Sequence, residues 1–473
     1  MKRRHSIMTL ILVVFTLCGC IPRRLFWSPD GQRAAIVAED GLRLCDAAGK
    51  LSEVVAKDVD LVAWLPDSRR LIAARRTEAA TWKEAAVALS PERQEALVKL
   101  ADPLREEVLA YSGDWDKFKP KVTGEMSDGE VAALILYVRD HRAQGLPEKL
   151  GEKWKEVEKA TAGVYLLQLY EVSQAGAVAG QVLARTLDGV GELRVSPDGQ
   201  AVACVLSISG GKQAVFRLSV LSTGGGGALR TVAEPVALFP DWTTDGRGLV
   251  YGSTPTRPVE GSDSLQLGTV AQRRVCDESG ELLKEFAAPE DLVGVVFAPQ
   301  MKIRCLPDGR VLFSAMEVTL PSTSRDMPQR ASLFSIDPGR RPTVARVIPR
   351  DTEANLPDGL AAGYFEVSPD ATRIAVAETG HANVSVLTLA TGAFEAVVTQ
   401  ADTELKSIPA WRTSQELSLF VPPKSPWGSA NRYEVVLWSG PDKARCLSRD
   451  WPDLFEKRNP ASRPAEAGKA DAR

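Results

Sequence analysis

A five-residue motif that returns seven times constrains the fold of this chain more than any other feature. Proline fixes φ, aspartate hydrogen-bonds nearby backbone and glycine adopts a positive φ, so each copy predicts a tight reversal between two strands. One copy alone would mean little, but seven in register indicate seven copies of one structural unit. The copies, the last of them degenerate, occupy Trp27–Gly31, Trp64–Ser68, Val195–Gly199, Trp242–Gly246, Cys305–Gly309, Val367–Ala371 and Trp411–Gln415.

A short apolar strand follows each turn, and further strands complete each unit to about four. The first unit continues with Ala34–Ala38, Gly41–Cys45 and Leu51–Val55, and the last with Glu416–Val421, Tyr433–Trp438 and Ala444–Leu447. The motifs stand 37 to 63 residues apart, with one gap of 131, which fits blades of roughly 40–50 residues with insertions. A four-stranded sheet cannot bury both faces alone, whereas a radial ring of sheets can. The sequence therefore predicts an all-β protein, a seven-bladed β-propeller over residues 25–451.

The Trp-Ser-Pro-Asp-Gly signature followed by an aliphatic strand resembles the WD40-like repeat of the TolB-type β-propellers. The resemblance covers Leu25 to about Arg449, apart from one insertion. TolB itself has six blades behind an α/β domain, and this chain shows seven motifs and no such domain, so membership of the Tol system is not implied. Related propellers precede the hydrolase domain of prolyl-oligopeptidase-like peptidases, but this chain ends at Arg473. We therefore expect no hydrolase domain.

The longest gap between motifs contains a segment of different character, residues 77–160. Ser90 followed by Pro91 is typical of a helix N-terminus, and Ser127 with Glu130 forms a capping box. Apolar residues then recur near a period of 3.6. We expect a helical insertion in the second hairpin of blade two. Its apolar stripes are explained by packing among the helices and onto the propeller, although a dedicated partner surface stays open as an alternative.

The first twenty residues are typical of an export signal. Lys2-Arg3-Arg4 form a positive start, and Ile7–Leu17 an apolar run that is too short to span a bilayer comfortably. Leu17-Cys18-Gly19-Cys20 resembles a bacterial lipobox, which implies a signal peptide over residues 1–19 and a lipid on Cys20. Residues 20–24 would then be the tether. An ordinary secretory signal with a chance cysteine is the alternative.

Strand order predicts on which end of the propeller this tether lies. The repeated turns are first connections of their blades, and the helical insertion is a second connection. We assign the segments Ser253–Ser264 and Thr319–Arg330 to long second-connection loops as well. Strand one must begin at the end opposite its own turn, so the tether and these elaborations should share one face. We expect that face, with Arg23 and Arg24 near anionic head groups, to lie toward the membrane.

Residues 452–473 contain too few apolar residues to fold, and we expect them to form a disordered tail.

No pattern in the sequence identifies a reaction. The histidines that follow the export signal are His141 and His381, and no Gly-x-Ser-x-Gly turn presents a nucleophile. No metal or cofactor motif occurs, so we expect neither catalytic residues nor cofactors. The repeated aspartates are interpreted as turn residues. The remaining cysteines are interpreted as buried thiols, although a disulfide is not excluded by their positions, Cys45, Cys204, Cys276, Cys305 and Cys446.

These features favour a non-catalytic envelope lipoprotein that uses a propeller to bind a protein or glycan partner near the membrane. The formal net charge of −3 makes nucleic acid an unsuitable partner. One alternative is a propeller-type lyase or glycosidase with carboxylates at the central channel, which spacing cannot reveal. A small-ligand sensor is another alternative. The oligomeric state, and the choice between inner and outer membrane, stay open.

Overall fold

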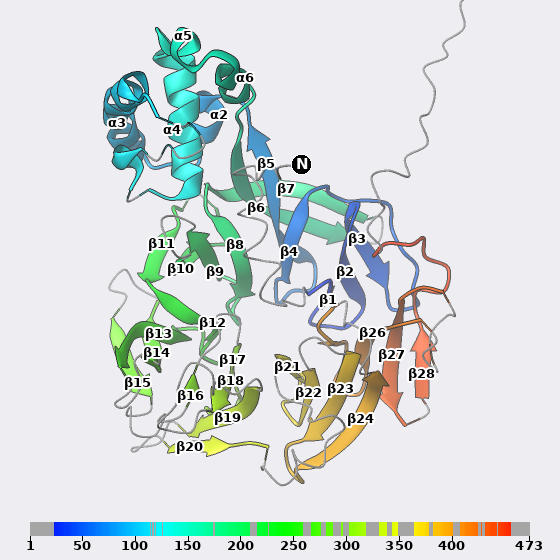
Figure 1. Ribbon diagram of the computed structural model, residues 1–473. Coiled ribbons are helices and arrows are strands. Elements are labelled where there is room, and N and C mark those ends of the chain that lie inside the picture. Colours follow the sequence, from blue (N-terminus) through cyan, green and yellow to red (C-terminus); the bar gives the residue numbers. More distant parts are fainter. Residues whose placement is uncertain are drawn as a thin grey trace, which may run out of the picture.

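The computed structural model contains seven antiparallel sheets arranged around one axis (Figure 1). Each sheet is formed by one continuous segment of chain, and its strands pair in chain order except in the five-stranded sheet, where two strands pair with the same neighbour. This arrangement is a seven-bladed β-propeller, as the sequence predicts. The structure describes residues 23–455 apart from 114, 116–117, 119, 125, 174–175, 209–214, 226, 259–265, 276–280, 287–294, 297–301, 318–330, 338–342, 349–363, 378–381, 401–406, 424–426, 428–430 and 442.

The first three blades hold strands β1 to β11. Blade one contains β1 (Leu25–Trp27), β2 (Arg33–Ala38) and β3 (Gly41–Asp46), and blade two contains β4 (Val59–Trp64), β5 (Arg70–Ala79), β6 (Ala162–Ser173) and β7 (Gly176–Thr186). Blade three contains β8 (Gly189–Val195), β9 (Ala201–Ile208), β10 (Val215–Ser222) and β11 (Arg230–Ala233). The fourth strand predicted over Leu51–Val55 is reduced to two isolated bridges. There the Ser52 hydroxyl accepts from the Leu44 amide at 2.9 Å, beside the backbone pairing.

The last four blades hold strands β12 to β28. Blade four contains β12 (Val236–Trp242), β13 (Gly248–Pro258), β14 (Gln266–Arg274) and β15 (Leu282–Phe286). Blade five contains β16 (Val295–Val296) and β17 (Ile303–Cys305), which both pair with β18 (Val311–Glu317), then β19 (Ala331–Asp337) and β20 (Thr343–Arg346). Blade six contains β21 (Tyr364–Val367), β22 (Arg373–Ala377), β23 (Ala382–Thr388) and β24 (Ala393–Gln400). Blade seven contains β25 (Ala410–Trp411), β26 (Leu417–Val421), β27 (Glu434–Gly440) and β28 (Lys443–Cys446).

The repeated motif forms the turn that the sequence predicts. In blade one the Gly31 amide donates to the Ser28 carbonyl at 2.8 Å, and the Asp30 carboxylate accepts from the Gln32 amide at 3.0 Å. Gly31 has a φ of +67°, which a side chain disfavours. Burial opposes ionisation of Asp30, but hydrogen bonds from Ser28 and Gln32 outweigh it and lower the pKa of that carboxyl. These aspartates are therefore structural parts of the turns.

The tryptophan that opens four of the motifs joins its blade to the preceding one. The indole nitrogens of Trp64, Trp242 and Trp411 donate to backbone carbonyls of the innermost strand next door, at 2.8–2.9 Å. Trp27 donates instead to the Ser418 hydroxyl at 3.1 Å. The accepting carbonyls belong to Phe26, Arg194 and Glu366, each of which immediately precedes the motif of its own blade.

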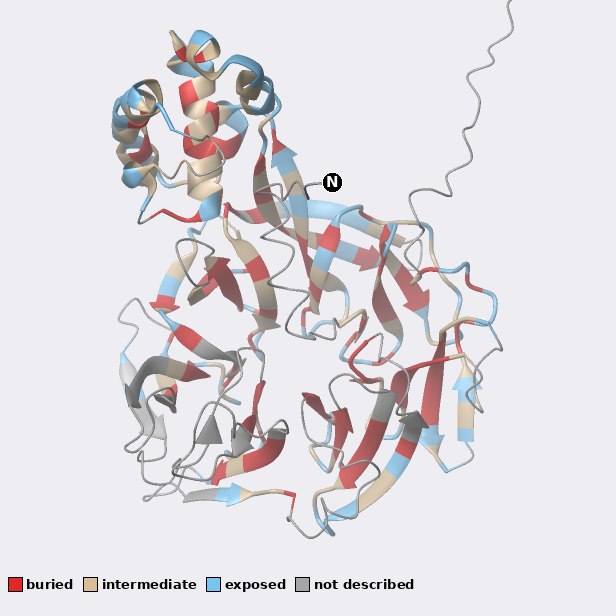
Figure 2. Cartoon of the chain, in the orientation of Figure 1, coloured by how far each residue is buried: buried red, intermediate tan, exposed pale blue. Residues whose placement is uncertain are grey.

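The hydrophobic core lies between the blades. Six clusters of buried apolar side chains each combine residues from two neighbouring blades. One of them joins Leu42 of blade one to Leu71 and Tyr170 of blade two. Figure 2 shows the buried residues following the strands around the ring. The blades therefore bury their apolar faces against one another, as expected for a repeat ring.

Blades one and seven close the ring without exchanging a strand, because each is formed by its own end of the chain. A segment beyond the last strand crosses this junction instead. Trp451 is 5% exposed and its indole donates to the Gly49 carbonyl at 2.7 Å. Leu454 is also buried, and its carbonyl accepts from the Glu39 amide at 3.2 Å. The expectation of a disordered tail from Pro452 is therefore wrong up to Phe455, because these apolar side chains have a core to enter. Residues 456–473 lie outside the described part.

The predicted helical insertion is present between β5 and β6 of blade two. Its helices are α2 (Trp82–Ala86), α3 (Pro91–Ala110), α4 (Asp128–His141), α5 (Leu146–Leu150) and α6 (Trp154–Glu158), with short 3-10 turns η2 (Lys121–Thr123) and η3 (Gly151–Lys153). Ser90 and Ser127 cap α3 and α4 as predicted. One apolar cluster joins α2 and α4 to the propeller through Ala162 and Leu187. No helix among the described residues is long and apolar enough to cross a membrane.

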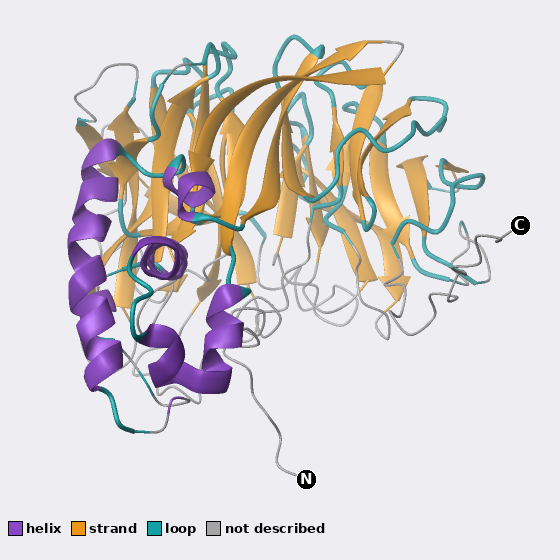
Figure 3. Ribbon diagram, turned by 90° about the horizontal axis from the view of Figure 1, so that it is seen from above, coloured by secondary structure: helices purple, strands orange, loops and turns teal. Residues whose placement is uncertain are grey.

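The start of β1 and the helical insertion lie at the same end of the propeller. The Asp30 amide donates to the Ser68 hydroxyl at 3.1 Å, so the turns of blades one and two are neighbours. Leu25 pairs with Ile36, and Ala79 pairs with Ala162, at the strand ends remote from those turns. In Figure 3 the helices reach beyond the ends of the neighbouring strands.

Two expectations about this end need correction. Ser253–Pro258 continues strand β13 and does not form a loop, whereas residues 259–264 and the whole of Thr319–Arg330 lie outside the described part. Arg23 and Arg24 belong to the propeller, since the Arg24 carbonyl accepts from the Val37 amide at 2.8 Å. Their guanidinium groups pair with Glu366 and Glu39 at 3.0 and 3.3 Å and do not point freely outward. The ion pairs satisfy these charges within the fold.

The closing segment generates a prediction about stability. We expect Trp451→Ala to lower the free energy of unfolding by about 3–5 kcal/mol, because it removes a buried indole from the junction of blades one and seven. Chemical denaturation followed by circular dichroism measures the change. The matched control is Trp154→Ala, where the indole is only partly buried on α6, and the expected loss there is well under half as large. Equal losses in both variants would contradict closure by this segment.

Candidate functional site

Charged side chains converge where the innermost strands of blades three to six meet. Arg194 on β8, Asp241 on β12, Arg304 on β17 and Glu366 on β21 each occupy the residue just before the turn motif. Their charges alternate in sign from blade to blade. The equivalent positions in the other three blades are Phe26, Ala63 and Ala410. With Arg23, Glu192 and Lys302, the four charged residues form what we call the channel cluster.

Glu366 is the centre of one half of this cluster. Its carboxylate lies 3.0 Å from the Arg23 guanidinium, 3.2 Å from the Lys302 ammonium and 3.4 Å from the Arg304 guanidinium. Burial opposes ionisation, but these three positive charges outweigh it and hold the pKa of Glu366 well below its usual range. Burial also lowers the pKa of Lys302 to about 8, despite the attraction of Glu366. The single negative charge of Glu366 therefore neutralises only part of the positive charge of these three cations.

Arg194 dominates the other half. Its Nη2 lies 2.8 Å from Glu192 Oε1, yet within the described part neither Nη2 nor Nε makes a hydrogen bond, although both atoms are shielded from solvent. Burial and the nearby charge of Arg304 lower the pKa of Arg194. Asp241 accepts from the Cys305 amide at 2.9 Å, and its negative charge also acts on Arg194. The guanidinium of Arg194 is thus paired by charge but incompletely hydrogen-bonded, which is costly for a buried donor.

The cluster is poorly suited to acid catalysis by its glutamates. A general acid needs a raised pKa, and the pKa values of Glu192 and Glu366 are both lowered. Raised carboxyl pKa values occur elsewhere, at Asp60 beside Arg76 and at Asp188 beside Arg217, in each case through burial. These two groups lie on separate parts of blades two and three. No group of three or more metal-ligating residues occurs among the described residues.

The residues that the sequence singles out do not meet in this site. Cys20, His381 and Cys276 lie outside the described residues. His141 stands at the last turn of α4, where its ring lies 4.8 Å from that of Tyr137. The described cysteines are all free thiols, and burial raises the pKa of Cys45 and of Cys204 to about 12. The burial of Cys45 and Cys204 agrees with the interpretation of buried thiols, whereas Cys305 and Cys446 are only partly buried.

The sequence did contain a signal for the channel cluster. When the seven repeats are aligned, the residue just before the motif is charged in blades three to six. A charged residue on the innermost strand is unusual, because that strand lies between two neighbours and near the axis. The residue types of the turn itself give no indication of these charges.

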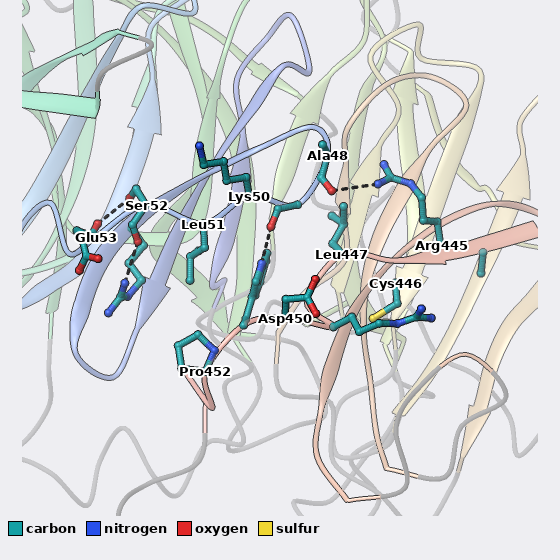
Figure 4. A pocket seen from close by; sticks show the side chains of 15 residues that line it. Ala48, Lys50, Leu51, Ser52, Glu53, Arg445, Cys446, Leu447, Asp450 and Pro452 are labelled. Carbon is teal, nitrogen blue, oxygen red and sulfur yellow. Dashed lines mark hydrogen bonds between the residues drawn. The ribbon is translucent and has the colours of Figure 1, made fainter.

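A separate hollow of about 1000 Å³ opens on the outer side of the junction between blades one and seven (Figure 4). Its walls come from the edge of blade one and from β28 with the closing segment. Arg445 donates to the Ala47 carbonyl at 2.9 Å, and Trp451 donates to Gly49 across it. These contacts hold the two blades together, so the hollow belongs to ring closure.

Solved structures similar to this chain include a β-propeller domain and several enzymes. They include the β-propeller domain of Cps50 (Swd1) from Myceliophteria thermophila, with a TM-score of 0.46, 9% identity and coverage of 89% of this chain and 96% of that chain. They also include an oligogalacturonate lyase in complex with manganese, with a TM-score of 0.47, 10% identity and coverage of 89% and 90%. A periplasmic gluconolactonase of Pseudomonas aeruginosa matches with a TM-score of 0.36, 13% identity and coverage of 59% and 77%. No family model and no curated protein sequence matches. Identities this low concern the fold alone.

The channel cluster generates a prediction about acid stability. We expect Glu366→Gln to destabilise the protein by about 3–5 kcal/mol at neutral pH, because three buried cations lose their shared carboxylate. Since the pKa of Glu366 is lowered in the fold, its ionisation stabilises the protein above pH 4.5, the ordinary value, and this contribution is lost as pH falls below it. The difference between wild type and variant should therefore shrink in acid, as measured by denaturation across pH.

Glu95→Gln is the matched control for this substitution. Glu95 forms an exposed ion pair with Lys99 on α3, and such pairs contribute roughly 0–1 kcal/mol. A loss at Glu366 no larger than at Glu95, or one that does not change with pH, would show that the cluster is not an electrostatic unit.

Proposed function

We propose that this protein is a non-catalytic envelope lipoprotein that uses its propeller to bind a protein or glycan partner close to a membrane. Cys20 carries the lipid in this proposal, after removal of residues 1–19. The lipobox-like sequence supports the anchor, and the resemblance of the repeats to TolB-type propellers agrees with an envelope location. The partner would be held between the anchored end of the propeller and the bilayer.

One observation carries this proposal. The start of β1 and the root of the helical insertion lie at the same end of the propeller, because both are remote from the neighbouring turns of blades one and two. Only Ile21 and Pro22 separate Cys20 from Arg23, which is part of the propeller, a reach of about 10 Å at roughly 3.5 Å per extended residue. A lipid on Cys20 would therefore hold the insertion near the membrane surface.

The insertion is a rigid part of that surface. The Cβ that an alanine would add at Gly129 meets the Leu187 carbonyl at 2.5 Å, so α4 approaches the propeller too closely for any side chain there. Arg93 on α3 forms two hydrogen bonds of 2.6 and 2.7 Å with Glu130 on α4. A surface whose parts are fixed in this way loses little entropy on binding a partner. This rigidity favours a binding platform.

The channel cluster gives less support to the alternative of a lyase or glycosidase. Retaining and inverting glycosidases need one carboxyl group with a raised pKa to protonate the leaving group. The two glutamates of the cluster have lowered pKa values, for the electrostatic reasons given above. A binding function requires no such acid.

Lipidation can be tested on the intact protein. We expect labelled palmitate to be incorporated into the wild-type chain, and to be lost in Cys20→Ser, because the modified atom is the sulfur of that residue. Cys18→Ser is the matched control and should keep the label. Label that survives in Cys20→Ser would overturn the proposed anchor.

Partner binding can be tested by photo-crosslinking in the envelope. We expect a crosslinking residue at Glu148, exposed on α5 of the insertion, to capture a defined protein or glycan, because the insertion faces the proposed partner. The same residue at Gln200, exposed on a turn at the opposite end, should capture nothing specific. Equal capture from both positions, or capture only from Gln200, would contradict the proposed binding face.

A further inference from the structure

We propose that the first half of strand β7 is a dimerisation edge, which pairs antiparallel with the same strand of a second copy of this chain. This inference goes beyond the proposed partner binding and does not depend on the lipid anchor. It rests on the position, the exposure and the composition of β7.

The first argument is the position and length of the strand. β7 is the outermost strand of blade two, and among the described strands only β6 pairs with it. It is 11 residues long, whereas the outermost strands of blades three to seven have four to eight residues. An edge strand directs the N–H and C=O groups of alternate residues away from its sheet, where a further strand can bind them. Propellers ordinarily keep such edges short.

The second argument is the exposure of the strand on both of its faces. Successive side chains of a strand point to opposite faces, yet residues 178–181 are all exposed (Figure 2). Val178 is 69% exposed, the largest value among the large apolar side chains of the described part. Neighbouring blades therefore cover neither face of this stretch. The accessible part ends at Gln181, because Gly225 in the turn after β10 lies directly against that side chain.

The third argument is the absence of charge. β7 carries no charged residue from Gly176 to Ala184. A charged side chain on an edge strand discourages pairing with another chain, and the outermost strands of blades three to seven all have this protection. Their charged residues are Arg230, Lys284, Glu285, Arg346, Glu395, Lys443 and Arg445. The first half of β7 is thus both longer and less protected than the other edges.

These residues suit a second copy of the same strand. Two β7 strands related by a two-fold axis run antiparallel, and the symmetry closes after two chains. An axis through Val178 sets this valine opposite its own counterpart, and Ala177 opposite Ala179. No like charges meet in this arrangement, and the exposed valines bury each other. The stretch from Gly176 to Ala179 also pairs regularly with β6, since the shifts of register lie beyond Ala179.

The C-terminal residues of the chain are a poor alternative for this edge. Residues 456–473 contain Pro460 and Pro464 among several charged residues, and proline cannot donate to a strand ladder. A strand of a different protein would leave the pure chain monomeric, so the oligomeric state distinguishes it from a second copy.

Sedimentation of the purified, detergent-solubilised full chain tests the proposal. We expect a monomer–dimer equilibrium that shifts toward the dimer as the protein concentration rises. Val178→Lys should weaken dimerisation by roughly tenfold or more, because two ammonium groups would then face each other across the axis. Val87→Lys is the matched control. Val87 is also exposed, at 58%, but follows α2 in the helical insertion, and its substitution should leave the equilibrium unchanged.

Val178→Cys adds a test in which a dimer is gained. Opposite Cα atoms of an antiparallel pair lie about 4.5–5.5 Å apart, which a disulfide can bridge. Oxidised glutathione should therefore link two Val178→Cys chains covalently and should not link Val87→Cys chains. Three results would overturn the proposal: a pure wild type that stays monomeric, dimerisation that is unchanged in Val178→Lys, or equal crosslinking in the two cysteine variants.

Discussion

The hydrogen bond from the motif tryptophan to the neighbouring blade is the interaction on which the rest of the structure depends. Trp64, Trp242 and Trp411 each fill the space between two blades, and each donates its indole proton to a carbonyl at the end of the adjacent innermost strand. A large apolar ring with one polar atom suits this place, because it packs against the core and also satisfies a backbone acceptor near the axis. The same residue also leads directly into the turn that begins the next strand. In these blades the motif therefore links the turn of a blade to the packing of that blade against the preceding one.

This dual role explains why the fold was predictable from sequence and the charged centre was not. The geometry of each turn depends on residues that are adjacent in sequence. The types of these residues alone indicate the turn, as Asp30 and Gly31 do in blade one. The helical insertion is equally local, since the caps at Ser90 and Ser127 depend only on neighbours in sequence. The channel cluster depends on contacts between residues such as Arg23 and Glu366, which are 343 residues apart in the chain. A sequence pattern within one repeat does not indicate a contact between residues of different repeats.

The closing segment was missed for a similar reason. Composition made residues 452–473 seem too polar to fold, and the two apolar side chains near its start were too few to suggest a core of their own. Leu454 and Phe455 instead join a core that already exists, where the Phe455 ring lies 4.8 Å from that of Phe420. Burial of an isolated apolar residue in an existing cluster needs no pattern around it. Charge patterns misled in the same way at Arg23 and Arg24, whose positions before the first strand suggested a membrane contact although both side chains pair within the ring.

Because no strand is shared between the first and last blades, the chain is divided into whole blades, and its two ends meet at one junction. A propeller of this kind could be circularly permuted at any boundary between blades, by joining the ends near Arg23 and Phe455 and opening the chain elsewhere, without cutting a sheet. A ring with an exchanged strand would lose that freedom at its closure. The same division means that duplication or loss of one blade would leave every remaining sheet complete. Growth by whole blades is therefore compatible with the way this ring is built, and the junction of blades one and seven is the place where a change in their number would have to be accommodated.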